Sequence, residues 1–104
     1  MLSLILDKDQ LETIQRILQL HFEGLRVYAY GERLSENETV APDAVLSIAV
    51  ISEKPIPFEE MVAVEKAFSE KNFPFHIDIV DWLKLPESLQ KSIKKESILI
   101  QGES

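Results

Sequence analysis

Residues 27–50 read VYAYGERLSENETVAPDAVLSIAV, and the rest of the chain is organised around this stretch. Its beginning is rich in β-branched and aromatic residues, which predicts a strand over residues 25–30 that ends at Gly31. Glycine permits a tight turn that a side chain with a Cβ atom resists. For the polar connection that follows we expect a helical turn at residues 33–38. Residues 44–51 are almost wholly apolar, which predicts a central strand covered on both faces.

Helical patterns flank these two strands. Apolar residues at helical spacing predict a first helix at about residues 8–22, with Asp7 or Asp9 as its N-cap. A second helix is predicted to open at Pro57 and to stop before Pro74. The residues that we expect it to bury are Met61, Val64 and Phe68.

The last third of the chain continues the alternation. Residues 75–80 predict a third strand, Pro86 opens a third helix, and residues 98–100 predict an edge strand. The apolar run at residues 2–6 is either a small strand or a segment packed on the sheet. The sequence therefore predicts a single domain over residues 1–104 of the α/β (α+β) class, a small mixed sheet of three to five strands with helices packed on it.

Composition excludes several classes of protein. The chain has no cysteine, which excludes disulfides, thiolate metal sites and a cysteine nucleophile. Its 18 acidic and 11 basic side chains give a formal net charge of −7, which argues against direct nucleic-acid binding. The N-terminal apolar run is too short for a signal peptide or a membrane span. We therefore expect a cytoplasmic protein without a membrane or nucleic-acid partner.

Gly31 and Glu32 stand ten residues, 33–42, before the triplet that begins at Asp43 and ends at Val45. In this spacing the chain resembles the minimal nucleotidyltransferases of the DNA polymerase beta-like superfamily. In that family a strand ends in Gly-Ser, ten residues follow, and Asp-x-Asp lies on the next strand. The resemblance covers nearly the whole chain and implies a nucleotidyltransferase-like fold.

The segment PFHIDIVD, residues 74–81, resembles the family's third strand, where Asp78 stands at the place of a third carboxylate. In the family, backbone N–H groups of the glycine turn hold the phosphates of a nucleoside triphosphate. Three carboxylates hold Mg²⁺, which stabilises the in-line displacement at the α-phosphorus. The resemblance thus implies a nucleotide-binding turn at Gly31, Glu32 and Arg33, with Asp43 and Asp78 as catalytic and metal-binding carboxylates.

Two departures from the family pattern weaken this chemistry. Val45 takes the place of the second aspartate, and a hydrocarbon side chain cannot coordinate a cation. Glu32 takes the place of serine and puts a carboxylate where a γ-phosphate would sit. Like charges about 4 Å apart repel by on the order of 1 kcal/mol even in water. As an alternative, Glu32, Glu36 or Glu38 reaches in as a substitute metal ligand.

Two further side chains near this motif have alternative roles. Arg33 either contacts a phosphate or pairs with Glu32 or Asp43, and the altered phosphate site favours the pairing. His76 lies two residues from Asp78 on the same strand face. We interpret His76 as a structural residue rather than a catalytic group or metal ligand.

Three functional hypotheses follow, of which we favour the first. It is a degenerate copy, or pseudoenzyme, that acts as the antitoxin of a HEPN-domain toxin, the partner that the resemblance implies. The second is an active enzyme that transfers NMP from ATP or another NTP to a partner protein, with Mg²⁺ held by Asp43 and Asp78. The third is a scaffold or oligomerisation domain without family chemistry. Trp82 and Leu83 are either interface or packing residues, and both homo- and hetero-oligomers stay open.

Overall fold

The computed structural model describes residues 1–102 and contains a four-stranded mixed sheet in the order β5-β4-β2-β6. At its centre β2 (Arg26–Tyr30) and β4 (Leu46–Ile51) run antiparallel. β5 (Ile77–Asp81) pairs with β4 in parallel, and β6 (Ile98–Gln101) pairs with β2 in antiparallel fashion. The predicted mixed sheet, with the strand of residues 44–51 at its centre and the C-terminal strand at an edge, is confirmed.

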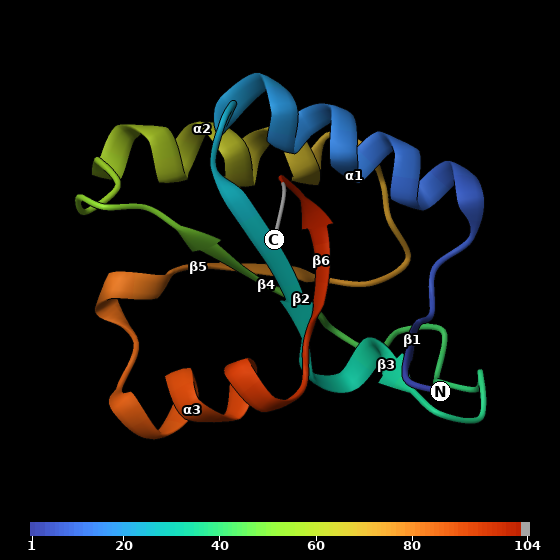
Figure 1. Cartoon of the computed structure of the whole chain (residues 1–104). Helices are drawn as coiled ribbons and strands as arrows, with labels where there is room; N and C mark the ends of the chain where they lie inside the picture. Colours follow the sequence, from blue (N-terminus) through green and yellow to red (C-terminus); the bar gives the residue numbers. More distant parts are fainter. Residues whose placement is uncertain (103–104) are drawn as a thin grey trace.

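The α-helices within residues 1–102 lie on both sides of this sheet (Figure 1). α1 (Lys8–His21) and α2 (Phe58–Ser69) lie side by side over one face, and α3 (Glu87–Lys95) lies on the other side. Their bounds confirm the three predicted helices. In the described part of the chain, no helix has the length and apolar character needed to cross a membrane.

Local side-chain chemistry explains where α1 begins. The Oδ1 atom of Asp7 accepts a hydrogen bond from the backbone N–H of Gln10 at 2.8 Å. The Gln10 Oε1 atom accepts one in return from the Asp7 N–H at 3.1 Å. This reciprocal arrangement satisfies two donors at the helix start, so Asp7 and not Asp9 is the N-cap.

The hydrophobic core lies between the sheet and the pair α1 and α2. Because side chains alternate along a strand, one set of strand residues points to these helices and the other set points away. The buried set from the strands and helices includes Val27, Ala29, Leu46, Ile48, Val50, Ile77, Ile79, Ile14, Leu18 and Val64. The other sheet face carries Tyr28, Tyr30 and Asp78, and α3 covers only part of it.

The segment after β2 corrects one prediction. Instead of a helical turn at residues 33–38, a 3₁₀ turn occupies Gly31–Arg33 and is followed by β3 (Leu34–Ser35). β3 pairs antiparallel with β1 (Ser3–Leu4), so the N-terminal apolar run forms a small strand. Pairing with a distant part of the chain thus overrides the local tendency of this segment to form a helical turn.

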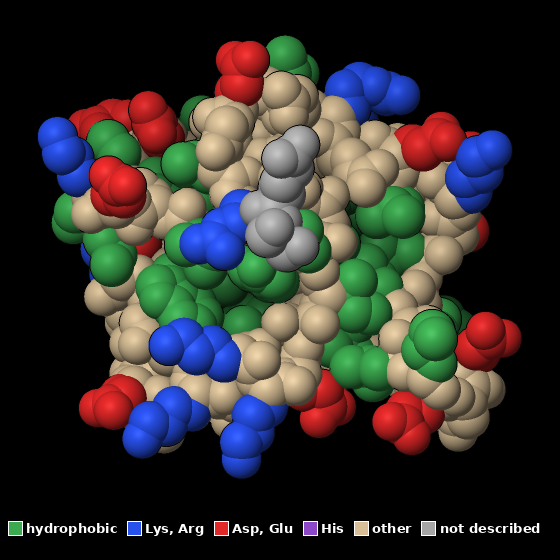
Figure 2. Space-filling view, in the orientation of Figure 1, with side chains coloured by type: hydrophobic (Ala, Val, Ile, Leu, Met, Phe, Trp, Pro, Cys, Tyr) green, Lys and Arg blue, Asp and Glu red, His purple; other side chains and the backbone are tan. Residues whose placement is uncertain are grey.

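Side chains of the two kinds of charge are spread around the face seen in Figure 2. Between them, hydrophobic side chains gather in hollows over the strands and beside α3. The sheet face opposite the core is therefore open to solvent in places. The candidate site lies on this face.

Candidate functional site

One row of polar side chains crosses the open sheet face at the end of β2. Tyr30 pairs with Ser47 on β4, and Ser47 pairs with Asp78 on β5. Gly31 follows directly and has a φ of +84°, in the region that favours glycine. A Cβ atom added at Gly31 would lie 3.5 Å from the Ser47 Oγ atom, so the turn passes close above this row. The sequence motif and Asp78 therefore do meet at one end of the sheet.

Glu32 connects the glycine turn to the approach to β4. Its Oε2 atom accepts a hydrogen bond from the backbone N–H of Val45 at 3.2 Å. Val45 is the residue that stands in place of the family's second aspartate. The structure thus places a carboxylate from the turn beside this position, but the carboxylate is held by a backbone donor. Glu32 itself is exposed.

Arg33 has a structural role that differs from both predictions for it. Its side chain is only 5% exposed. The Nε atom donates to the Ile5 carbonyl at 2.9 Å, and Nη1 donates to the carbonyls of Ala44 at 2.8 Å and Pro42 at 3.3 Å. The guanidinium carbon lies 4.2 Å from the centroid of the Phe75 ring, at cation–π distance.

The predicted pairing of Arg33 with Glu32 or Asp43 is wrong. Among residues 1–102, the ion pair within 4.0 Å joins Lys91 to Glu87 on α3. The N–H groups on Nε and Nη1 of Arg33 all donate to backbone carbonyls. This arginine therefore joins the loop before β4 to the residue that follows β1, and it does not pair with a carboxylate. Burial lowers the pKa of Arg33 from its ordinary 12.5.

Tyr30 and Asp78 interact electrostatically across the row. Burial raises the pKa of Tyr30 above the ordinary 10.0, and the negative charge of Asp78 raises it further. The Tyr30 phenol is half-buried, whereas Asp78 is exposed. The row therefore presents two hydroxyl groups and one carboxyl group, all able to bind a polar group.

The described residues do not assemble the three-carboxylate metal site of the family. In the described residues no three His, Cys, Asp or Glu side chains come together in a way that could hold a metal ion. Asp43 is exposed in a turn, and β4 begins only at Leu46. The strand predicted over residues 44–51 therefore begins two residues later than expected, and Asp43 and Val45 both precede it. This donor set does not fit the three-carboxylate arrangement of Mg²⁺ ligands that the family implies, and a Mg²⁺ site at Asp43 and Asp78 alone stays a prediction.

The start of β4 at Leu46, two residues later than predicted, has a local cause. The Ala44 N–H donates to the Ala41 carbonyl at 3.0 Å and closes a turn. The Ala44 carbonyl accepts from Arg33 and not from a neighbouring strand. Pairing of β4 with β5 begins where the Leu46 N–H donates to the His76 carbonyl at 3.0 Å.

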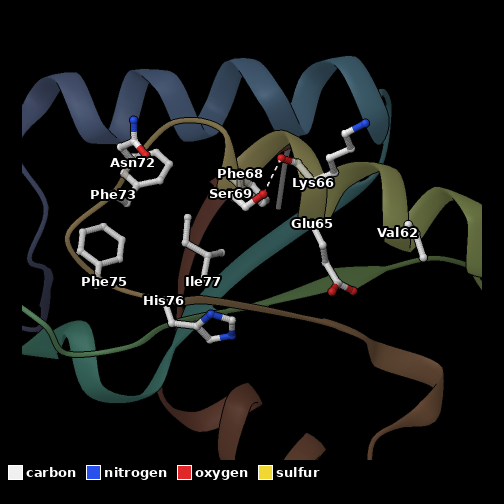
Figure 3. Close-up of a pocket in the computed structure, with 10 residues that line it drawn as sticks. All are labelled: Val62, Glu65, Lys66, Phe68, Ser69, Asn72, Phe73, Phe75, His76 and Ile77. Atoms are coloured by element: carbon white, nitrogen blue, oxygen red, sulfur yellow. Dashed lines mark hydrogen bonds between the residues drawn. The ribbon is translucent and has the colours of Figure 1, made fainter.

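A cavity of about 600 Å³ lies between α2 and the segment that leads into β5 (Figure 3). Phe68, Phe75 and Ile77 give it an apolar floor, and Ser69 Oγ donates to the Lys66 carbonyl at 2.9 Å within α2. His76 lies at its edge and is exposed. Neither Asp43 nor Asp78 lines this cavity, so it is separate from the polar row. The structural role of His76 stays a prediction.

Two polar residues near the site were absent from the predicted set. Ser47 is the one polar residue inside the apolar run of residues 44–51, which is a signal that the sequence contains. Asp81 is buried at the end of β5, where its carboxylate accepts from the N–H groups of Ile56 at 2.9 Å and Leu83 at 3.0 Å. Asp81 thus joins the loop before α2 to the turn after β5.

The two interface candidates differ in exposure. Trp82 is partly buried beside α3, whereas 45% of the Leu83 side chain is exposed. Leu83 therefore remains available as an interface residue.

No model of a protein family matches the chain. A curated relative does match, the probable protein adenylyltransferase MntA of Haemophilus influenzae. It is 31% identical over 99 residues, which cover 95% of this chain and 85% of the relative.

Solved structures of low sequence identity share the fold. A chain from the crystal structure of a toxin–antitoxin with AMP-PNP is 15% identical, with a TM-score of 0.72 over 90% of this chain and 74% of that one. A chain from the complex of a tri-AMPylated Shewanella oneidensis HEPN toxin with an MNT antitoxin is 16% identical. Its TM-score is 0.68, over 92% and 72% of the two chains. These likenesses confirm the predicted class, a protein of nucleotidyltransferase-like fold. The relative defines it further, and the chain belongs to the MntA family of minimal nucleotidyltransferases.

Proposed function

We propose that this chain is an antitoxin that binds and neutralises a HEPN-domain toxin by contact, with nucleotidyl transfer weak or absent. The observation that carries the proposal is the hydrogen bond from the Val45 N–H to the Glu32 carboxylate. This one contact joins the two positions at which the chain departs from the family pattern. Both positions are needed for nucleotide and metal chemistry in the family.

Loss of catalysis follows from the charges and donors at the site. Val45 offers no oxygen atom to a cation, so the carboxylate that bridges two metal ions in the family has no counterpart here. The Glu32 carboxylate accepts the hydrogen bond of the Val45 N–H beside the glycine turn, and its charge repels a phosphate that approaches the same turn. Together these features oppose both halves of a metal–triphosphate complex.

Binding of a HEPN-domain toxin is supported by the relatives. The family member from H. influenzae is named a protein adenylyltransferase, and the solved structures of the same fold are toxin–antitoxin complexes. A protein that has kept this fold while its catalytic residues changed still has the surface with which to bind a partner. Contact alone is then sufficient for neutralisation.

An active enzyme is the second candidate. Asp78 is exposed in a row with Ser47 and Tyr30, directly beside the Gly31 turn. In this alternative, Asp43 and Asp78 hold one Mg²⁺, and ATP or another NTP donates its nucleotidyl group to the partner. The relative's name as a protein adenylyltransferase favours this candidate.

Co-expression with a HEPN-domain toxin separates the two candidates. The test compares the wild-type chain with an Asp43→Asn, Asp78→Asn double variant. We expect both to restore growth and the toxin's intact mass to stay unchanged in both strains. An Asp9→Asn, Glu12→Asn variant on the exposed side of α1 is the matched control for the lost charges. If only the double variant fails, folds normally by circular dichroism, and the wild type adds mass to the toxin, the active enzyme is correct.

A further inference from the structure

A second hollow, of about 280 Å³, lies between the open sheet face and α3. Strand residues Arg26, Tyr28 and Ile51 form one side of it, and Trp82, Ile93 and Lys94 form the other. Figure 2 shows a depression lined by hydrophobic side chains in this region, with basic side chains at its margin. It lies at the opposite end of β2 from Tyr30 and Gly31, so it is distinct from the polar row.

The wall formed by α3 is fixed by several contacts. The Gln90 Nε2 atom donates to the Trp82 carbonyl at 2.8 Å and thereby holds the turn Trp82–Lys84 against the helix. The carboxylate of Asp81 caps the same turn through the Leu83 N–H. Ile93 is buried and anchors α3 on the sheet. The backbone that carries Trp82 is therefore held in place before any ligand arrives, which lowers the cost of binding.

The charge at this hollow is opposite to that of the protein. The chain carries a net charge of −7, yet Arg26 and Lys94 both line the hollow, and no Asp or Glu does among the residues described there. The Lys94 ammonium lies 5.9 Å from the centroid of the Trp82 ring. Aromatic and aliphatic side chains thus form the floor, and two cationic groups lie beside it.

We propose that this hollow binds a small planar aromatic anion, such as an aromatic carboxylate or an aryl phosphate. Its ring packs on Trp82, Tyr28 and Ile51, and its anionic group lies between Arg26 and Lys94. The volume of the hollow is just under the range of about 300–1,000 Å³ found for ligand pockets, so it accommodates one or two rings. The proposal goes beyond antitoxin function, because neither a toxin nor a nucleotide is involved.

Fluorescence of Trp82 tests the proposal directly, because it is the only tryptophan of the chain. Three probes are titrated into the purified protein: phenyl phosphate, inorganic phosphate and benzyl alcohol. We expect saturable binding of phenyl phosphate to one site, at least tenfold tighter than either of the other two probes. Equal affinities for the three probes, or no saturation with phenyl phosphate up to about 10 mM, would overturn the proposal.

Variants identify the cationic groups in the same titration. Lys94→Gln removes one charge beside the hollow and should weaken phenyl phosphate binding by about fivefold, the effect of one nearby charge in a solvated site. Arg26→Gln is a second, independent variant with the same expectation. Lys91→Gln is the matched control, because Lys91 lies on the same helix but is exposed and pairs with Glu87. The proposal is wrong if all three variants weaken binding equally.

A last variant keeps the result separate from the proposed function. Asp78→Asn changes the polar row at the other end of the sheet face and should leave phenyl phosphate binding unchanged. If Asp78→Asn changes the affinity and Lys94→Gln does not, the probe occupies the polar row and not this hollow.

Discussion

Arg33 stands at a position where the family motif implies contact with a phosphate, but its side chain binds the protein's own backbone. The carbonyls of Ile5, Pro42 and Ala44 receive its N–H groups, and the Phe75 ring covers its guanidinium. A single side chain therefore joins the segment after β1, the loop before β4 and the approach to β5. At the scale of the residue, the part of the site that was expected to bind a ligand stabilises the fold instead.

Replacement of Arg33 by methionine should lower the free energy of unfolding by about 2–4 kcal/mol, since buried carbonyls lose their donors. Urea unfolding followed by circular dichroism measures the change. Arg16→Met on the exposed side of α1 is the matched control and should cost less than about 0.5 kcal/mol. Equal losses for the two variants would show that the buried contacts of Arg33 contribute little.

Tyr30 should ionise at a higher pH than an ordinary tyrosine, because burial and the charge of Asp78 both oppose the phenolate. Ultraviolet titration of a Tyr28→Phe protein isolates its signal, since Tyr28 and Tyr30 are the only tyrosines. Asp78→Asn should lower the pKa of Tyr30 part of the way to 10.0 and leave the burial effect. No change on Asp78→Asn would contradict the interaction across the row.

The same shift has a consequence for stability against pH. An acid whose pKa is higher in the folded than in the unfolded state keeps more protons when folded. The contribution of Tyr30 is therefore fully present below the unfolded pKa of about 10 and is lost as pH rises through the folded pKa. Tyr30→Phe should remove this loss, and urea unfolding between neutral and strongly alkaline pH measures it.

At the scale of the element, the turn Gly31–Arg33 depends on its glycine. Gly31 and Gly24 have φ angles of +84° and +82°, so both positions strain an alanine. An added Cβ atom meets nothing within 4 Å at Gly24 and makes only an ordinary contact with Ser47 at Gly31. Gly31→Ala and Gly24→Ala should therefore cost similar amounts, about 1–2 kcal/mol each. Thermal unfolding of the two variants checks this, and a much larger loss for Gly31→Ala would show that Ser47 restricts the turn.

Elements with strong periodicity could be predicted from the sequence, and those set by distant contacts could not. The bounds of α1 follow from its apolar spacing and the Asp7 cap, which are local signals. By contrast, residues 33–38 have the sequence of a helical turn, but Leu34 and Ser35 form β3 because they pair with β1. The two strands are 30 residues apart in the sequence, from Leu4 to Leu34, and lie side by side in space. The start of β4 was misplaced for a similar reason, since Arg33 binds the Ala44 carbonyl.

The candidate site shows the same division. Its members Gly31, Glu32 and Asp78 were found by spacing, and the sheet register does bring Gly31 and Asp78 to one end of the open face. The hydrogen bond from Val45 to Glu32 could not be predicted, because it depends on the path of the loop between them. Sequence spacing therefore selected candidate residues that the fold brings to one end of the sheet, whereas their contacts required the three-dimensional arrangement.

At the scale of the whole molecule, the fold is a nucleotidyltransferase framework in which Glu32 and Val45 depart from the family motif, and we propose that both departures oppose nucleotidyl transfer. A Val45→Asp, Glu32→Ser double variant should therefore bind Mg²⁺-ATP in isothermal titration, whereas the native chain should give no heat of binding. Aspartate at position 45 adds an oxygen ligand, and serine at position 32 removes the charge that repels the triphosphate and adds a donor.

A Val62→Asp, Glu60→Ser variant makes the same chemical changes on the exposed side of α2 and serves as the matched control. It should be as silent as the native chain, because its new carboxylate lies on the helix layer and not on the open sheet face. If the native chain itself binds Mg²⁺-ATP at micromolar affinity, and Asp78→Asn abolishes the heat, then Asp43 and Asp78 are sufficient for a metal site. Contact alone would then no longer be a sufficient account of the function, and catalysis would have to be measured on the toxin.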